Sequence, residues 1–532
     1  MGPSLEGETA AVTRRRRLTL AAMCIAQGMT LLDITIVNTA LPAIQRDLHM
    51  TPGRLEWVIS AYALSLAAFI PLGGALGDRY GRKRFFVVGM VIFALGSTAC
   101  ALSTTDLSLI VSRAVQGVGG AVMSALTLSI LTETFPPARR AGAIGAWAAI
   151  AGLGFGLGPV VGGILLSFAD WSSVFWVNVP IAVIGLAVTV VAVEESRDTQ
   201  ARHLDVVGVA LLAFGLLGIT FGLIESSSHP WGDGLVVLPL TGGLMLVLAF
   251  LLWERHTPTP MLPSTLFRAR SFTTGCVVYL LGYLALTGVM FYVTLLFQNV
   301  DGWSPLRTGV SWLSMNIPFL LTAQYAGGLS RRFPPWVVVS GGCAIGAISV
   351  GVLASVSDTT NFGVAFVGYV LLGVGWGAFV PATINVAMRD VPEGTSGGAS
   401  GIVNAARQVG SSVGLAVLGA IGVNAASSAW ARQTSSVADA GRQAQAVAGA
   451  EITAVTHALG ADVRGAAVDA FLSGYRLAML TAALCTLAAA VVAVFGLRHV
   501  PRVPPSAPPR ARPAPEQDRA VDPVGSPAPA VD

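Results

Sequence analysis

The residues best suited to chemistry in this chain are two charged side chains inside long apolar segments. Asp33 lies in the run LLDITIVNTALP of the first segment, and Arg113 lies in the run RAVQGVGGAV of the fourth. A carboxylate in the hydrocarbon of a bilayer is unfavourable by roughly 2.5–3.5 kcal/mol even on lenient insertion scales, and intramembrane ionisable residues usually mark functional sites. The position of Asp33 therefore predicts a proton or cation site.

The spacing of these residues within their segments places them at similar depth. At 1.5 Å per residue, Asp33 lies about 22 Å from the inner start of its segment, in a hydrocarbon core of about 30 Å. Arg113 lies about 9 Å from the outer end of its own segment. A pair at that depth would offset part of the unfavourable burial of each charge. A static structural ion pair is the alternative interpretation.

The other acidic residues are predicted to lie in loops, in tails or near segment ends. Glu133 and Glu225 are of the last kind, and we expect water to reach them easily. Asp33 is the one acidic residue that is predicted to lie deep within a membrane span.

The composition indicates an integral membrane protein with many spans. Of its 532 residues, 54% are hydrophobic and only 11% are charged, whereas soluble proteins carry about 25% charged residues. The net charge of +4 without a basic stripe argues against nucleic acid as a partner. The five cysteines are scattered, so no metal site is predicted. No histidine lies at depth and no nucleophile motif is present, which argues against an enzyme.

Fourteen segments are long and apolar enough to span a bilayer, which requires about 20 residues each. Loops rich in Arg alternate with loops poor in Arg, so the positive-inside rule places both termini in the cytoplasm. We therefore expect a multi-pass protein of the cytoplasmic membrane. The predicted spans are residues 18–43, 55–77, 85–104, 107–132, 141–167, 173–193, 204–224, 234–253, 272–298, 306–329, 335–356, 361–388, 396–424 and 471–497.

The two ends of the membrane domain are related by an internal repeat. GVGGAV at 117–122 recurs as GVGWGAF at 373–379, and four glycines of the fifth segment recur in the thirteenth at the same offset. Parallel repeats are typical of transporters that bind their substrate between two bundles. The predicted organisation is a cytoplasmic tail (1–17), a six-helix bundle (18–193), two linking spans (194–271), a second bundle with an outer loop at 425–470 (272–498), and a disordered cytoplasmic tail (499–532).

The turn between the second and third segments reads GGALGDRYGRK (73–83). It resembles the loop motif of the major facilitator superfamily, in which this motif latches a gate between the two halves. A plain positive-inside loop is the alternative. The second copy, GGLSRRFPP (327–335), lacks the acidic residue. The residues expected to form the latch are Gly74, Asp78, Arg79, Gly81, Arg82 and Lys83.

Three further motifs narrow the resemblance. The fifth segment resembles the antiporter motif, which marks exporters in that superfamily. LDITIVNTALP (32–42) and WSSVFWVNVP (171–180) resemble motifs of the fourteen-span drug:proton antiporters, and Arg113 and Gln116 match a fourth-span motif whose Arg is implicated in proton transfer. The antiporter motif is carried by Gly154, Gly158, Pro159, Gly162 and Gly163.

The resemblance implies an all-α major facilitator fold of two six-helix bundles plus two extra central spans. It also implies proton-driven efflux of drugs or antibiotics by alternating access. The proton gradient supplies the energy, so no cofactor is expected. The expected partners are a small-molecule drug or antibiotic, protons and membrane lipids, with the protein itself a monomer. A dedicated exporter of one metabolite, lipid or siderophore is the alternative.

A substrate cavity between the bundles would need polar and aromatic side chains at depth. For the aromatic candidates plain packing is the alternative, and for Arg407 the alternative is a static pairing with backbone carbonyls or the opposite bundle. The candidates are Asn38, Gln116, Arg407, Gln408, Tyr283, Trp376 and Asn316.

Overall fold

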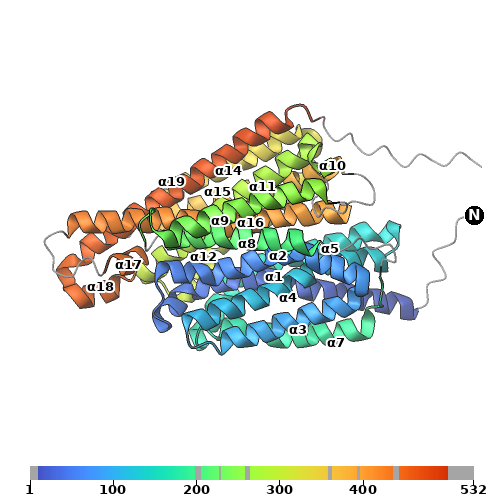
Figure 1. Cartoon of the computed structure of the whole chain (residues 1–532), viewed down its shortest axis with the longest axis horizontal. Coiled ribbons are helices and arrows are strands. Elements are labelled where there is room, and N and C mark those ends of the chain that lie inside the picture. The colour runs from blue at the N-terminus through green and yellow to red at the C-terminus, as the bar shows by residue number, and fades with distance from the viewer. Residues whose placement is uncertain are drawn as a thin grey trace, which may run out of the picture.

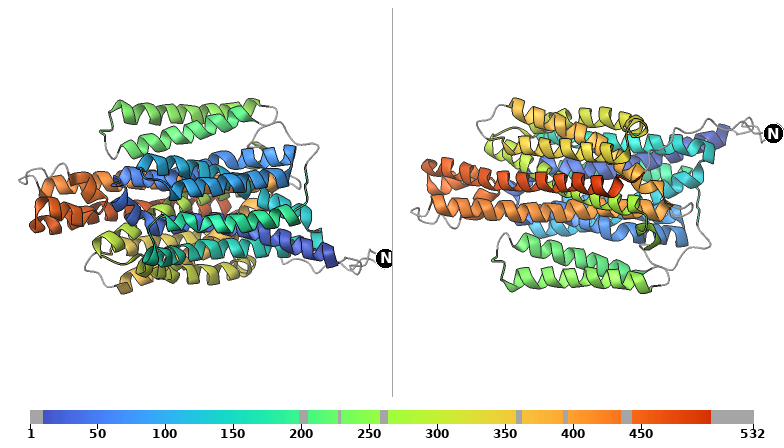
Figure 2. Two further views of the ribbon diagram at one scale, coloured as in Figure 1. Left: turned by 90° about the horizontal axis from the view of Figure 1, so that it is seen from below. Right: turned by 90° about the horizontal axis from the view of Figure 1, so that it is seen from above.

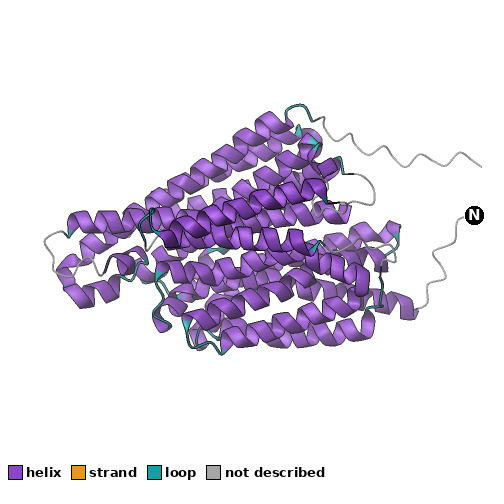
Figure 3. Cartoon of the chain, viewed as in Figure 1, coloured by secondary structure: helices purple, strands orange, loops and turns teal. Residues whose placement is uncertain are grey.

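A computed structural model describes residues 10–197, 205–226, 229–257, 264–357, 362–391, 396–434 and 443–500. Every regular element in these ranges is a helix (Figure 3). This confirms the predicted all-α class, and it follows from the lipid environment, where a helix bonds all its backbone groups internally. Most of the predicted C-terminal tail lies outside the described residues.

The first bundle contains seven helical pieces, the last two of which form one broken span. They are α1 (Ala10–Asp47), α2 (Pro52–Tyr80), α3 (Arg82–Ala101), α4 (Asp106–Thr134), α5 (Pro137–Phe168), α6 (Ser173–Trp176) and α7 (Asn178–Ala192).

The second bundle has the corresponding elements and ends in a long helix. It comprises α11 (Arg270–Leu295) with the π-helical turn η2 (Leu296–Val300), α12 (Pro305–Ser311), α13 (Leu313–Arg332), α14 (Pro335–Ala354), α15 (Phe362–Arg389), α16 (Ser396–Gln433) and α19 (Arg464–Leu497). Between the bundles lie α8 (Val206–Glu225), α9 (Gly234–His256) and α10 (Ser264–Phe267), and α16 and α19 are separated by α17 (Ala444–Ala448), α18 (Ile452–Leu459) and η4 (Ala461–Val463).

Twelve helices in the described ranges are long and apolar enough to cross a membrane. The two other predicted spans fall on α5 and on α12 with α13, which are not among the twelve. In α13 the sequence LSMNIPFLLTAQYAGGLSRR carries many polar residues, which lowers its hydropathy. The count of fourteen spans therefore stays a prediction.

The helices at the chain ends extend beyond the predicted spans. The first helix starts at Ala10 rather than near residue 18, so the basic run at 14–17 is helical. Arg is a good helix former, and Arg16 Nε donates to the carbonyl of Thr134 at 3.0 Å, which ties this extension to α4. The predicted outer loop 425–470 is also shorter, because α16 continues to Gln433 and α19 begins at Arg464.

The predicted repeat appears as repeated packing. Helix α1 packs on α5 as α11 packs on α16, while α2 and α3 pack on α4 as α13 and α14 pack on α15. Gly154 lies against the backbone of Gly28, and Gly410 lies against the backbone of Leu280 at the equivalent crossing. Glycine is required at both crossings because a side chain would hold the backbones apart.

The linking helices lie outside the two bundles. Figure 2 shows α8 and α9 as a hairpin to one side of the molecule, and α8 packs against both α2 and α16. These helices are central in the sequence only.

The two bundles meet mainly through α2 with α16 and through α5 with α12. Figure 1 shows α14 and α19 tilting away from α3 and α7 toward the end of the molecule where the chain starts. The start of α1 and the end of α19 lie at that same end (Figure 1), as an even number of crossings requires.

Candidate functional site

Asp33 on α1 and Arg113 on α4 form a buried ion pair. Arg113 Nη1 donates to Asp33 Oδ2 at 2.6 Å. The side chain of Arg113 is 1% exposed and that of Asp33 is 0% exposed. The structure thus brings together the two residues that the sequence placed at similar depth.

Two amides complete the coordination of the Asp33 carboxylate. Gln116 Nε2 donates to Asp33 Oδ1 at 2.9 Å, and Asn178 Nδ2 donates to the same oxygen at 2.7 Å. Asn178 also donates to Ser97 Oγ at 3.1 Å. Three N–H donors from α4 and α7 therefore surround the carboxylate, an arrangement that suits its ionised form because charge-assisted hydrogen bonds are strong.

Asn178 was not among the predicted site residues. It lies in the run WSSVFWVNVP, which drew attention only as a family motif. The sequence did contain a signal for Asn178, which is an amide side chain within an apolar span. A buried polar group needs a hydrogen-bond partner, so such an amide is a candidate contact of another buried polar residue.

Arg113 is anchored to α2 independently of Asp33. Its Nε donates to the carbonyl of Val58 at 3.0 Å, and its Nη1 donates to Gln116 Oε1 at 2.8 Å. Its guanidinium also lies over the ring of Tyr62, 4.2 Å from the centroid, where a cation–π attraction operates. Arg113 consequently keeps several contacts when the charge of Asp33 is removed, whereas α1 loses its ionic contact with α4.

The remaining predicted cavity residues lie apart from this pair. Arg407 Nε donates to Asn404 Oδ1 at 3.0 Å, and its guanidinium lies 5.6 Å from the ring centroid of Tyr283. Gln408 is buried next to Arg407 on α16. In the described part of the chain none of these side chains hydrogen-bonds to Asp33.

Three further candidates lie in packed contacts. Asn38 Nδ2 donates to the carbonyl of Ile34 on its own helix at 2.9 Å. Asn316 Nδ2 donates to the carbonyl of Gly156 at 2.6 Å and so joins α13 to α5 across the two halves. Trp376 is buried within the second bundle.

The predicted latch residues form contacts within the first bundle. Arg82 Nε donates to Asp78 Oδ1 at 2.8 Å, and its Nη1 lies 3.3 Å from Glu133 Oε2. Lys83 Nζ donates to the carbonyl of Val190 at 2.8 Å. The described contacts of these residues include none to the second bundle, so the latch between the halves stays a prediction.

The backbone of the latch turn depends on a glycine. Gly81 has φ of 120°, a conformation that L side chains rarely adopt. Its neighbour Glu195 accepts hydrogen bonds from the backbone N–H groups of Lys83 and Arg84 at 3.1 Å each. Arg79 lies over the ring of Tyr80, 5.4 Å from the centroid. Gly74 lies one turn before Asp78 on α2.

The antiporter-motif glycines pack α5 between the two halves. Gly154, Gly158 and Gly162 face α1, while Gly163 and the carbonyl of Pro159 lie against α12. Because α12 belongs to the second bundle, this motif forms part of the contact between the halves.

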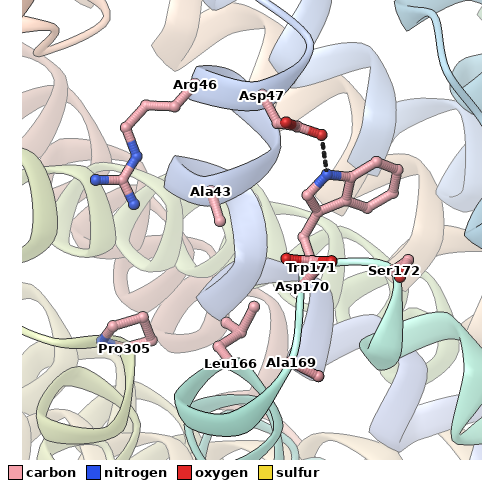
Figure 4. Close-up of a pocket in the computed structure, with 9 residues that line it drawn as sticks. All are labelled: Ala43, Arg46, Asp47, Leu166, Ala169, Asp170, Trp171, Ser172 and Pro305. Atoms are coloured by element: carbon pink, nitrogen blue, oxygen red, sulfur yellow. Dashed lines mark hydrogen bonds between the residues drawn. The ribbon is translucent and has the colours of Figure 1, made fainter.

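A pocket of about 670 Å³ lies at the predicted outer ends of α1, α5 and α12 (Figure 4). Arg46, Asp47 and Asp170 contribute its charges, and Trp171 Nε1 donates to Asp47 Oδ2 at 2.7 Å. None of the predicted cavity residues lines this pocket. The buried pair, rather than this surface hollow, is therefore the candidate functional site.

Comparisons with solved structures show the fold. A bacterial homologue of the human lysosomal transporter Spinster, solved in an inward-facing and unoccupied conformation, superposes with a TM-score of 0.63 at 16% identity. The match covers 91% of this chain and 97% of that one.

Comparisons with curated proteins show relatives that are named for resistance or export. The tetracenomycin C resistance and export protein of Streptomyces glaucescens is 32% identical over 503 residues, covering 91% of this chain and 92% of its own. The multidrug resistance protein Stp of Mycobacterium tuberculosis is 34% identical over 77% of this chain and 76% of its own. The cephamycin export protein CmcT of Amycolatopsis lactamdurans is 33% identical over 78% of this chain and 87% of its own.

The family model of the Major Facilitator Superfamily matches residues 23–415. That match covers most of the chain and includes the buried pair, the latch turn and the antiporter motif. The chain therefore belongs to the major facilitator superfamily and is a multi-pass membrane transporter rather than an enzyme.

Proposed function

We propose that this protein exports drugs or antibiotics across the cytoplasmic membrane in exchange for protons, by alternating access. The observation that carries the proposal is the Asp33–Arg113 pair, because a carboxylate held at depth by removable contacts can bind and release a proton. The named relatives act in resistance or export, which supports the outward direction and the substrate class.

Protonation of Asp33 is the step that we propose to couple the proton to conformation. A proton removes the charge of the carboxylate and weakens the contact with Arg113, which stays on α2 through Val58 and Tyr62. Helix α1 then loses its ionic contact with α4. We propose that a cationic or polar group of the substrate also breaks the contact between Asp33 and Arg113, by displacing Arg113 from the carboxylate. Substrate binding and protonation would then act on the same contact at different steps of the cycle.

The contacts between the halves support an arrangement that is closed on the predicted outer side. Gln298 Nε2 donates to the carbonyl of Thr39 at 3.0 Å, and Asn299 Nδ2 donates to Gln45 Oε1 at 3.2 Å. Both contacts join η2 to the outer part of α1. We propose that they separate when the transporter opens outward and that the latch turn then joins the inner ends.

The test is a drug-susceptibility panel in an efflux-deficient host that produces either the wild type or Asp33→Asn at matched levels in the membrane. Resistance to several unrelated compounds that is lost in the variant would support a polyspecific antiporter. Resistance to one chemical class would favour the dedicated exporter instead. Everted vesicles with a pH-sensitive dye then report whether an active compound moves protons.

Two variants make this test specific. Asp33→Glu keeps the acid and should retain part of the export, while Asp462→Asn removes an exposed acid on η4 and should export normally. Normal, proton-dependent export by Asp33→Asn would refute the role of this carboxylate.

A further inference from the structure

A second buried carboxyl group lies where the two halves meet. Glu56 is the fifth residue of α2, about 6 Å along the helix from its start at Pro52. Its side chain points to α16, where it lies against Gly419 so closely that a Cβ on that glycine would collide with it. Glu56 thus belongs to the first bundle but contacts the second.

The carboxyl group of Glu56 is buried without a polar partner among the described residues. The residue is 1% exposed, and neither carboxyl oxygen accepts or donates a hydrogen bond within that part of the chain. An ionised carboxylate without a partner is strongly unfavourable away from water, so such a group takes up a proton instead. Asp33 differs, because three N–H donors hold it.

The surroundings of Glu56 are apolar on the side of the linking helices. Trp57 packs against Phe221 of α8 with ring centroids 6.2 Å apart, and Ala416 of α16 belongs to the same apolar cluster. Helix α8 therefore covers the contact between α2 and α16. Since Glu56 is 1% exposed in this arrangement, we infer that water reaches it when α2 and α16 separate.

The titratable groups of the neighbouring elements are engaged elsewhere. On α2 and α4, Arg54 pairs with Asp106 at 3.4 Å, and at the end of α8, Glu225 pairs with His229 at 3.4 Å. Glu451, between α17 and α18, accepts a hydrogen bond from Gln45. Arg407 of α16 bonds to Asn404 within its own helix.

On α11, Tyr292 is the titratable group nearest to this contact. Its hydroxyl lies 3.4 Å and 3.3 Å from the carbonyls of Leu418 and Gly419 on α16, to which it donates. This leaves the hydroxyl proton directed at the backbone rather than at Glu56. Within the described ranges, no cation forms an ion pair with Glu56 that would hold it ionised.

We propose that Glu56 is a second proton-binding site, which holds a proton while the outer halves of the bundles are closed and releases it when they part. The proposal rests on the proton-driven cycle proposed above and adds a site to it. The contact between α2 and α16 would then depend directly on pH. This dependence is separate from the pH dependence of the pair formed by Asp33 and Arg113.

The sign of the dependence follows from proton linkage. The closed arrangement binds one more proton at Glu56 than the open one, so acid favours closure and alkali favours opening. For one proton, the ratio of closed to open molecules changes by at most about tenfold per pH unit. A variant that cannot ionise at this position loses that part of the response.

The experiment measures the distance between the outer ends of the bundles in purified protein in lipid nanodiscs. Spin labels are attached at Thr104 and Ser355, two exposed positions beyond α3 and α14, in a background with the five cysteines replaced. Distance distributions are recorded from pH 5 to pH 9 for the wild type, Glu56→Gln, Glu56→Asp and the control Glu225→Gln.

In the wild type and the control, the ratio of molecules with a short distance to those with a long distance should fall as the pH rises, by at most about tenfold per unit. Compared with the wild type, Glu56→Gln should hold more of the short distance at alkaline pH, because only Asp33, whose protonation favours opening, then responds to pH. Glu56→Asp should respond like the wild type because it keeps a carboxyl group. An unchanged pH response in folded Glu56→Gln would overturn the proposal.

The same series in an Asp33→Asn background separates the two carboxyl groups. The proposal expects the difference in pH response between proteins with and without Glu56→Gln to persist there, and its disappearance would overturn an independent site. Failure of the proposed function would appear differently, as wild-type export without proton movement in vesicles. The label distances would still decide whether Glu56 links pH to closure.

Discussion

Removing one member of the Asp33–Arg113 pair should destabilise the protein more than removing both. In Asp33→Asn, Arg113 remains as a buried cation with a neutral partner, and in Arg113→Gln, Asp33 remains as a buried acid. The double variant leaves an amide at each position, and two amides can hydrogen-bond to each other.

The structure sets the expected magnitudes. Both side chains are almost fully buried and in direct contact at 2.6 Å, and breaking such a pair typically costs about 3–5 kcal/mol. Independent effects would sum to about 6–10 kcal/mol in the double variant. Because the double variant contains no unpaired charge, we expect it to lose only about 1–3 kcal/mol, in line with the often small effect of replacing a whole buried pair.

The assay is reversible unfolding of the purified protein in mixed micelles with increasing denaturing detergent, followed by tryptophan fluorescence. The four proteins of the cycle are compared at one pH and one lipid composition. Asp462→Asn, which changes an exposed acid, serves as the control and should unfold like the wild type.

Additive effects would refute this reasoning. If the loss of stability in the double variant equalled the sum of the two single losses, the two residues would not be coupled energetically. The proposal that protonation of Asp33 weakens its contact with Arg113 would then lack its physical basis. A double variant that is near the wild type in stability but inactive in export would separate the functional from the structural role of the pair.

Two other predictions concern packing and the outer loop. Gly154→Ala should reduce export and stability, because a methyl group there meets the backbone of Gly28, whereas Gly242→Ala, which meets nothing within 4 Å on α9, should be silent in the same growth and melting assays. Burial raises the pKa of Glu451, against the smaller lowering effects of the hydrogen bond from Gln45 and the charge of His49. The folded state therefore binds this proton more readily than the unfolded state, and the corresponding stability is lost as the pH rises above 4.5. Glu451→Gln should melt at or above the wild-type temperature at pH 7, and a lower melting temperature would show that the ionised form is the stabilising one.

The sequence predicted the architecture well because its signals were local. Apolar length defined the helices, and the glycine repeat predicted equivalent crossings, such as those of Gly154 and Gly410. Asp33 and Arg113 could be matched because depth follows from counting residues along a helix. The helix ends were less predictable, since α1 and α16 extend through polar residues that neighbouring helices accommodate.

The surroundings of each side chain depended on tertiary contacts and could not be predicted in the same way. Glu56 lies near a helix end, where the sequence suggests access to water, yet it is 1% exposed and lies against Gly419 of α16. The latch residues matched a motif, but the partners of Arg82 were set by the packing of α2, α3 and α4 within the first bundle. Asn178 was recognisable as polar within a span, but only the fold places it on Asp33.

Helix α1 connects the buried pair with the contacts that close the predicted outer side. Asp33 lies about 9 Å along this helix from Thr39, whose carbonyl binds Gln298, and about 18 Å from Gln45, which bonds to Asn299 and Glu451. A rigid helix transmits a shift at one point to the others. Loss of the Arg113 contact would therefore move the same element that joins η2 and the outer loop to the first bundle.

Because Glu56 lies on a different helix, at the contact of α2 with α16, the two carboxyl groups act on separate contacts between the halves. In the proposed cycle, outward opening breaks both contacts, so a proton at Asp33 favours the change while the proton at Glu56 opposes it until water enters. Two such sites would make the direction of proton movement depend on the order in which the contacts open.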